Sequence, residues 1–152
     1  MSKSELLDEA VIDAPPVTVY RAVLNEYAGV THWWMPYMDF KLRGDTPIDR
    51  EGAIVDATAL PTSRIKSSKA SYKIIKLVEG KSIEYEETGA FIGTGKWSLE
   101  PTDGKTKVQF RLNVKINSRL ISFASHFVNT EKMHSDTMEK AFTALNSYLN
   151  KK

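Results

Sequence analysis

The side chains best suited to acid–base chemistry in this chain are Glu87 and two tyrosines, Tyr72 and Tyr85. A carboxyl group in an apolar pocket has a raised pKa and can donate or accept a proton near neutral pH. A tyrosine offers an apolar ring and one hydroxyl that can orient a ligand. We therefore treat Glu87 as a candidate catalytic residue, with the alternative that it lies solvated at a strand end.

Other catalytic arrangements find little support. His126 and His134 are eight residues apart, about two helical turns, and His32 has no ligand partner nearby, so no metal site is expected. No serine occupies a nucleophile elbow, and the Gly-Thr-Gly-Lys stretch at 93–96 lies in an expected strand rather than before a helix. Cysteine is absent, which excludes disulfides and thiolate chemistry. No cofactor is expected.

Composition and charge favour one soluble domain over residues 1–152, with 41% hydrophobic and 26% charged residues. The net charge of +2 is too small to favour nucleic acid or an anionic membrane. The basic stretch 64–81 is followed by glutamates and lacks an aromatic platform, so we interpret it as a solvated face. Neither a signal peptide nor a run of about 18 apolar residues is seen, so a cytoplasmic protein is expected.

The hydrophobic pattern predicts one strand, two short helices, six strands and one long helix. The first strand covers 6–12, and prolines then suit the first turn of a helix that ends at Gly29. A second short helical turn closes at Pro36. The remaining strands are expected at 37–43, 53–60, 66–78, 81–88, 92–100 and 105–116, and the long helix at 119–149. This helix is the only element large enough to cover the apolar face of the sheet.

Turn signals set the register of the central strands. Asp103-Gly104 is a two-residue hairpin signal that sets Trp97 opposite Phe110. Glu79-Gly80, read the same way, sets Lys73 opposite Glu86. A three-residue loop at 89–91 keeps the faces consistent. The inward face is then Tyr72, Ile74, Ile83, Tyr85, Glu87, Gly93, Gly95, Trp97, Leu99, Val108, Phe110, Leu112, Val114 and Ile116.

Two inward glycines, Gly93 and Gly95, have two compatible interpretations. Glycine within a strand often marks a bend or a close approach of another group. The pair could serve only to curl the sheet, with Tyr85 lying over Gly95 to cover bare backbone. The pair could also leave a hollow that forms part of a cavity, in which case Gly93→Val should stay folded and bind an apolar probe more weakly.

The stretch 29–38 gathers two of the three tryptophans and two of the five methionines of the chain. Adjacent residues on a helical turn point about 100° apart. We therefore expect one of Trp33 and Trp34 to pack into the core or pocket, and the other to lie near the surface at the pocket mouth. The alternative is that both belong to ordinary core and rim packing.

Three features in this order resemble the START-like, Bet v 1-like superfamily (SRPBCC), and within it the bacterial polyketide cyclase/dehydrase branch. They are the stretch 12–15 (Ile-Asp-Ala-Pro) leading a strand into a helix, Trp34 with Pro36 after that helix, and six strands before a long terminal helix. The resemblance covers nearly the whole chain. It implies an α+β helix-grip fold: a curved, seven-stranded antiparallel sheet around a long C-terminal helix, with two short helices between strands 1 and 2.

The same resemblance implies a cavity between sheet and helix that holds a small hydrophobic molecule such as a lipid, sterol, polyketide or quinone. The superfamily shares no catalytic motif, so no catalytic residue is carried over. The candidate ligand-binding residues are Trp34, Tyr72, Tyr85, Gly93, Gly95, Trp97, Phe110, Leu112 and Phe127.

Three functions stay open at this stage. The favoured one is a carrier or sensor of a small hydrophobic ligand. The second is an enzyme of the cyclase/dehydratase kind that uses Glu87 or a tyrosine. The third is a protein-interaction module similar to the chaperone-activator branch, whose exposed aromatic cluster would meet a partner. A monomer or homodimer is expected, without nucleic acid and without integration into a membrane.

Overall fold

The computed structural model describes residues 4–60, 68–89, 91–116 and 130–150. Seven strands form one antiparallel sheet in the order β1-β7-β6-β5-β4-β3-β2. The elements in chain order are β1 (Ser4–Ile12), α1 (Pro16–Tyr27), β2 (Met38–Arg43), β3 (Ile54–Ala59), β4 (Ser68–Val78), β5 (Ser82–Gly89), β6 (Phe91–Thr102), β7 (Lys105–Ile116) and α2 (Thr130–Leu149).

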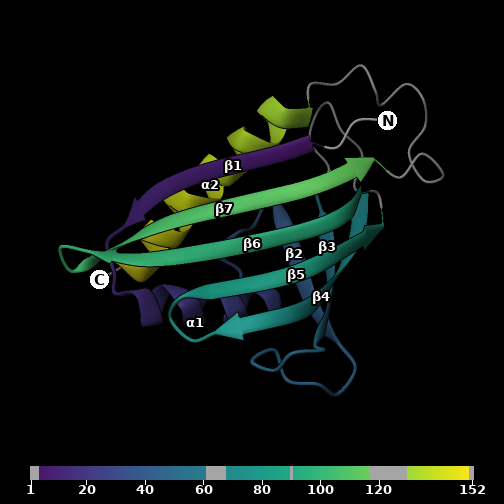
Figure 1. Ribbon diagram of the computed structural model, residues 1–152, viewed down its shortest axis with the longest axis horizontal. Coiled ribbons are helices and arrows are strands. Elements are labelled where there is room, and N and C mark those ends of the chain that lie inside the picture. Colours follow the sequence, from purple (N-terminus) through teal and green to yellow (C-terminus); the bar gives the residue numbers. More distant parts are fainter. Residues whose placement is uncertain (1–3, 61–67, 90, 117–129, 151–152) are drawn as a thin grey trace.

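The sheet curves around the two helices, which lie on the same side of it (Figure 1). The C-terminal helix α2 packs against β1, and α1 contacts β2, β6, β7 and α2. The predicted helix-grip arrangement is therefore confirmed. No helix among the described residues is long and apolar enough to cross a membrane.

Helix α1 begins and ends where the sequence predicts. Pro16 occupies a first-turn position, where its missing N–H leaves no hydrogen bond unmade. At the other end the N–H of Gly29 donates to Glu26 O and the N–H of Val30 donates to Asn25 O, both at 3.0 Å. This is a Schellman motif, and it needs the left-handed backbone that Gly29 adopts at φ 77°.

The second short helix predicted between the first two strands is not formed. Residues 33–37 are turns, in which the N–H of Met35 donates to His32 O and the N–H of Tyr37 donates to Trp34 O. Pro36 has no N–H to donate, so the repeating bond pattern of a helix cannot develop through it. One helix and a series of turns therefore connect β1 to β2.

The predicted strand register is confirmed along β5, β6 and β7. Trp97 lies opposite Phe110, and the turn between them has Asp103 at φ 50° and Gly104 at φ 78°, as a type I′ hairpin requires. Lys73 lies opposite Glu86. All predicted partners of Ile83, Tyr85 and Glu87 on β6 are also found.

The hairpin between β4 and β5 differs in its turn. Val78 pairs with Ser82, so the loop has three residues, 79–81, rather than two. A bulge between Ile74 and Lys76 then shifts the register by one position, and this restores the predicted pair of Ile74 with Tyr85. The predicted face of each side chain beyond the bulge is therefore correct even though the turn is not.

The core lies between the inward face of the sheet and the helices. From α2 it takes Met138, Ala141, Phe142 and Leu145, all buried. The part of the long helix predicted at 119–129, which includes the candidate residue Phe127, lies outside the described residues.

Candidate functional site

A cluster of polar groups lies inside this otherwise apolar core. Its members are Tyr27, Tyr72, Tyr85, Glu87 and Trp97, all buried, and we call it the tyrosine–glutamate cluster. Strand alternation turns Tyr72 on β4, Tyr85 and Glu87 on β5, and Trp97 on β6 to one face. Helix α1 adds Tyr27 from above that face. The cluster therefore joins residues from three strands and one helix.

The rings of the cluster contact one another closely. Tyr72 and Tyr85 stack with ring centroids 4.2 Å apart, and Tyr27 meets each of them edge-on at 5.7 and 6.0 Å. Trp97 Nε1–H donates a hydrogen bond of 2.7 Å to the Tyr27 hydroxyl. Such contacts hold the three hydroxyl groups in fixed positions.

Glu87 is the carboxyl group of this cluster and is only 6% exposed. Burial raises its pKa to about 7, because removing a carboxylate from water penalises the charged form. No hydrogen bond or ion pair joins its carboxyl group to another residue in the described parts of the chain. Such a group can take up or release a proton near neutral pH.

The pKa values of the three tyrosines shift in the same direction as that of Glu87. Burial raises the pKa of Tyr27, Tyr72 and Tyr85, and the nearby negative charge of Glu87 raises each pKa further. All three hydroxyls therefore stay protonated at neutral pH and can act as hydrogen-bond donors. The cluster thus combines one exchangeable proton with three uncharged donor groups.

The two inward glycines do not leave an open hollow. A Cβ on Gly95 would lie 2.3 Å from Tyr85 Cζ, so the tyrosine ring covers this glycine, as one of the two interpretations expected. A Cβ on Gly93 would lie 2.0 Å from the backbone oxygen of Asn113 and 2.7 Å from Val114 Cα on β7. The expectation that Gly93→Val would stay folded is therefore wrong, since the side chain would meet backbone rather than empty space.

Both tryptophans of the turn segment are buried, with exposed fractions of 8% for Trp33 and 5% for Trp34. Their rings stack in parallel, with centroids 5.4 Å apart and planes 9° apart. The expectation that one ring would lie near the surface is therefore wrong. It assumed a helical turn, whereas the observed turns let both rings point to the same side.

Glu26, at the end of α1, holds this segment in place, a role that was not predicted from the sequence. One of its carboxylate oxygens accepts hydrogen bonds from Thr31 Oγ1 at 2.7 Å and from the Trp33 N–H at 3.1 Å. The other accepts from the Trp34 N–H at 2.9 Å. Glu26 is 2% exposed. A glutamate near a helix end carries no sequence signal for this role, because its three donors come from the turn that follows.

The three indole N–H groups differ in their partners. Trp33 Nε1–H donates to Ala22 O at 3.2 Å, and Trp97 Nε1–H donates to Tyr27. Trp34 Nε1 is buried and has no hydrogen-bond partner among the residues that the structure describes. The ring of Trp34 lies 5.2 Å from Phe40 and 6.1 Å from Trp97, which connects it to the tyrosine–glutamate cluster.

The structure brings most of the predicted ligand-binding residues together. Phe110 lies 5.0 Å from Trp97 and 6.5 Å from Tyr85 between ring centroids, and Leu112 is buried on the same strand. Tyr27 and Phe40 belong to the same group but were not predicted as site residues. Tyr27 could have been found, since it falls at helical spacing from Tyr20 on the apolar side of α1.

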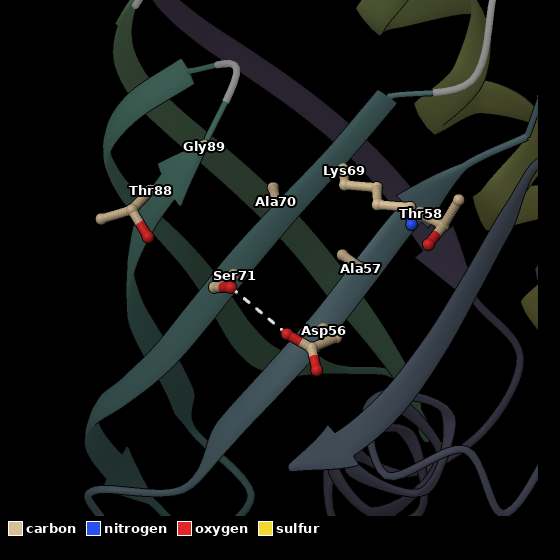
Figure 2. A pocket seen from close by; sticks show the side chains of 8 residues that line it. All are labelled: Asp56, Ala57, Thr58, Lys69, Ala70, Ser71, Thr88 and Gly89. Atoms are coloured by element: carbon tan, nitrogen blue, oxygen red, sulfur yellow. Dashed lines mark hydrogen bonds between the residues drawn. The ribbon is translucent and has the colours of Figure 1, made fainter. Parts of the chain in front are cut away.

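A separate, polar hollow of about 480 Å³ lies at β3, β4 and the end of β5. Figure 2 shows the side chains that line it. Its polar side chains come from outward-facing strand positions. Asp56 there accepts hydrogen bonds from Arg43 and Ser71, and the Arg43 guanidinium lowers the pKa of Asp56. Arg43, Asp56 and Ser71 are hydrogen-bonded to one another, so this hollow has no proton-exchanging group comparable to Glu87. Among the residues that the structure describes, no three His, Asp or Glu side chains could jointly hold a metal ion.

Comparison with known proteins agrees with this fold. The family model described as polyketide cyclase / dehydrase and lipid transport matches residues 6–150. The crystal structure of Ara h 8.0201 is 17% identical with a TM-score of 0.69, and 97% of each chain is covered. The Zhui aromatase/cyclase from a Streptomyces species is 10% identical with a TM-score of 0.68, covering 97% of this chain and 93% of that one.

A solution structure of the Aha1 dimer from Colwellia psychrerythraea is 17% identical with a TM-score of 0.61. It covers 94% of this chain and 96% of that one. At these identities the likeness concerns the fold alone. A search of curated proteins found no match.

Proposed function

Because the chain belongs to the polyketide cyclase / dehydrase and lipid transport family, we propose that it binds a small, largely apolar molecule against the inner face of its sheet. The observation that supports this best is the tyrosine–glutamate cluster. Protein cores rarely bury a carboxyl group without a partner, because desolvation is costly. Ligand sites, in contrast, are mostly apolar with a few polar groups that orient the ligand. The cluster has this composition.

Native mass spectrometry of the purified protein tests the proposal. We expect a protein species carrying one retained small molecule, which organic extraction then releases for identification. A second arm titrates the extracted protein with Nile red, an uncharged apolar dye. Binding should weaken in Tyr72→Ala, on the inner face, and stay unchanged in Lys73→Ala, its outward-facing neighbour. Protein that carries no molecule and binds no dye, while folded, would contradict the proposal.

A second candidate function is an enzyme that eliminates water from a β-hydroxy ketone, as a cyclase/dehydratase would. The specific observation in its favour is the pKa of about 7 at Glu87, beside three protonated hydroxyls. In this reaction the Glu87 carboxylate removes the proton next to the carbonyl, and a tyrosine hydroxyl donates a hydrogen bond to the carbonyl oxygen. The protonated Glu87 then returns that proton to the departing hydroxyl, so that water leaves and an enone forms.

This candidate is tested with 4-hydroxy-4-phenylbutan-2-one as substrate. Formation of the enone should be accelerated by the wild-type protein and reduced at least about a hundredfold in Glu87→Gln, the range for removal of a general base. The variant still has to bind Nile red. Binding without turnover in the wild type would leave the carrier function and reject this one.

The third function considered from the sequence, a protein-interaction module, loses the feature on which it depended. The aromatic cluster is buried, and in that segment only Val30 and Met35 are exposed large hydrophobic residues, at 70% and 43%. A cytoplasmic location and a monomeric or dimeric state stay predictions. Cell fractionation and light scattering of the purified protein check them.

A further inference from the structure

Trp34 presents a buried hydrogen-bond donor without an acceptor. The residue is 5% exposed, and its Nε1–H has no hydrogen-bond partner within the described parts of the chain. A buried indole N–H normally finds an acceptor, because leaving it unpaired costs most of the desolvation energy of the group. An orphaned donor in a core therefore calls for an explanation.

The neighbours of Trp34 do not supply the missing acceptor. The rings around it are Trp33, Phe40 and Trp97, and Trp97 turns its own N–H to the Tyr27 hydroxyl. Glu26, whose carboxylate is hydrogen-bonded to the backbone N–H of Trp34, already accepts three hydrogen bonds from the turn segment. These bonds fix the backbone of Trp34, so the indole is held in place with its donor unused.

The charged residues on the inner face indicate which net charge a molecule that provides the acceptor can carry. Among the described strand residues that face inward, Asp8 and Glu87 are acidic and none is lysine or arginine. Glu26 adds a buried carboxyl from α1, whereas Asp8 is only half-buried. An anionic ligand would find no lysine or arginine on these described strand positions to offset the loss of its hydration, which is strongly unfavourable.

We propose that Trp34 Nε1–H donates a hydrogen bond to a carbonyl oxygen of the bound molecule, so that the ligand is an uncharged, apolar carbonyl compound such as an aryl ketone, a quinone or an ester. This inference rests on the proposed function, because it concerns the same inner face. It adds the residue that recognises the ligand and the chemical class that it selects.

Three naphthalene probes of similar size test the inference. They are 2-acetylnaphthalene, with a carbonyl, 2-ethylnaphthalene, without one, and 2-naphthoate, an anion. The wild-type protein should bind the ketone roughly three to ten times more tightly than the ethyl compound, as expected for one neutral hydrogen bond. It should bind the anion more weakly than either neutral probe.

The tryptophans provide an internal control in the same experiment. In a ¹⁵N–¹H spectrum the Trp34 indole N–H signal should move downfield with the ketone and much less with the ethyl compound. The Trp33 signal should stay, because that N–H already donates to Ala22 O. The preference for the ketone should disappear in Trp34→Phe and persist in the matched variant Trp33→Phe.

The outcomes separate this inference from the proposed function. Equal affinity for the two neutral probes, with an unmoved Trp34 signal, would overturn the inference and leave apolar ligand binding intact. A Trp34 indole signal that shows magnetisation transfer with a bound water and does not move when the ketone is added would also overturn the inference. A buried water would then be the acceptor. Tightest binding of the anion would overturn the charge argument. Failure of both neutral probes would reject the proposed function itself. If Trp34→Phe does not fold, the wild-type spectrum decides.

Discussion

Glu87 is a buried carboxyl group on the inner face, and its burial affects both the stability of the fold and the protonation of the group. Its neighbours on β4 and β6 are Tyr72 and Gly93, so neither provides a positive charge. The protein tolerates the buried carboxyl by raising its pKa to about 7, which keeps it largely protonated below neutral pH. Residues held in this way are found more often at functional sites than elsewhere, because a purely structural role rarely needs them.

Replacing Glu87 with glutamine should make the protein more stable at high pH but not at low pH. The pKa of Glu87 rises from 4.5 in the unfolded chain to about 7 in the folded one. Below pH 4.5 both states are protonated and the effect vanishes. As pH rises from 4.5 to 7, the unfolded state loses its proton while the folded state keeps it, so the wild type loses stability. Above pH 7 the loss is complete, at on the order of 3 kcal/mol.

Urea denaturation of Glu87→Gln and wild type between pH 4 and pH 8 measures this difference. The two free energies of unfolding should agree at about pH 4 and diverge in favour of the variant through the window given by the two pKa values. Glu86→Gln, an exposed position on the outward face, is the matched control. Curves that stay parallel for Glu87→Gln would mean that its carboxyl is solvated in the folded protein.

Gly93→Ala should be destabilising although alanine is tolerated in most strands. The added Cβ would fall 2.0 Å from Asn113 O, so β6 and β7 have to separate locally. We expect a loss of about 2 kcal/mol or more, as for other substitutions that overfill a packed site. Thr94→Ala, at the exposed neighbouring position, is the control for thermal unfolding. If Gly93→Ala is as stable as this control, the backbone of β7 can move away from the added Cβ at little cost, and the prediction is wrong.

At the scale of elements, the turn segment 31–37 depends on a single side chain of the preceding helix. Glu26 accepts hydrogen bonds from Thr31 Oγ1 and from two successive backbone N–H groups. The segment is therefore anchored to α1 and presents Trp33 and Trp34 to the core together. This arrangement positions the unpaired indole N–H that we assign to ligand recognition.

Glu26→Ala should loosen this turn. Three donors lose their acceptor, two of them buried backbone groups, and we expect a loss on the order of 2–4 kcal/mol. Tryptophan fluorescence during urea denaturation reports both the stability and the surroundings of the stacked indoles. Glu79→Ala is the matched control, because Glu79 forms an exposed ion pair with Arg21 that should contribute less than about 1 kcal/mol. Equal losses in the two variants would exclude the anchoring role of Glu26.

The strands were predictable because their turns carry strong local signals. Asp103-Gly104 predicts the β6–β7 register, and the three-residue loop at 89–91 then places Glu87 on the inward face opposite Gly93. The bulge after Ile74 and the burial of both indoles were not predictable. The turn that carries the indoles is held by hydrogen bonds from Glu26, and no sequence period connects Glu26 with its donors. The bulge carries no turn residue that marks it in the sequence. The close approach of the β7 backbone to Gly93 was not predicted either, because the alternation of residues along a strand does not show how close the neighbouring strand lies.

At the scale of the whole molecule, hydrogen bonds join the connection between β1 and α1 to helix α2 and to strand β7. The Asn146 side chain on α2 accepts a hydrogen bond of 2.9 Å from the Asp13 N–H, just after β1. Thr106 Oγ1 on β7 donates to Ala14 O at 2.6 Å. Helix α2, β1 and the start of α1 are thus tied together at one end of the fold (Figure 1). The inner face is then enclosed by α2 on the side of β1.

Phe142→Ala tests whether α2 closes the core as this arrangement requires. Phe142 is 6% exposed, and its ring meets the edge of Trp97 at 6.2 Å, so helix and sheet touch at the cluster itself. We expect a loss of roughly 3–5 kcal/mol in urea denaturation, the usual range when a buried phenylalanine is truncated. Tyr148→Ala, on the same helix but 43% exposed, should cost far less. Because the lost ring borders Trp97, the variant that remains folded should also bind Nile red with altered affinity. A loss below about 1 kcal/mol, with dye binding unchanged, would mean that α2 contributes neither to the core nor to the ligand site.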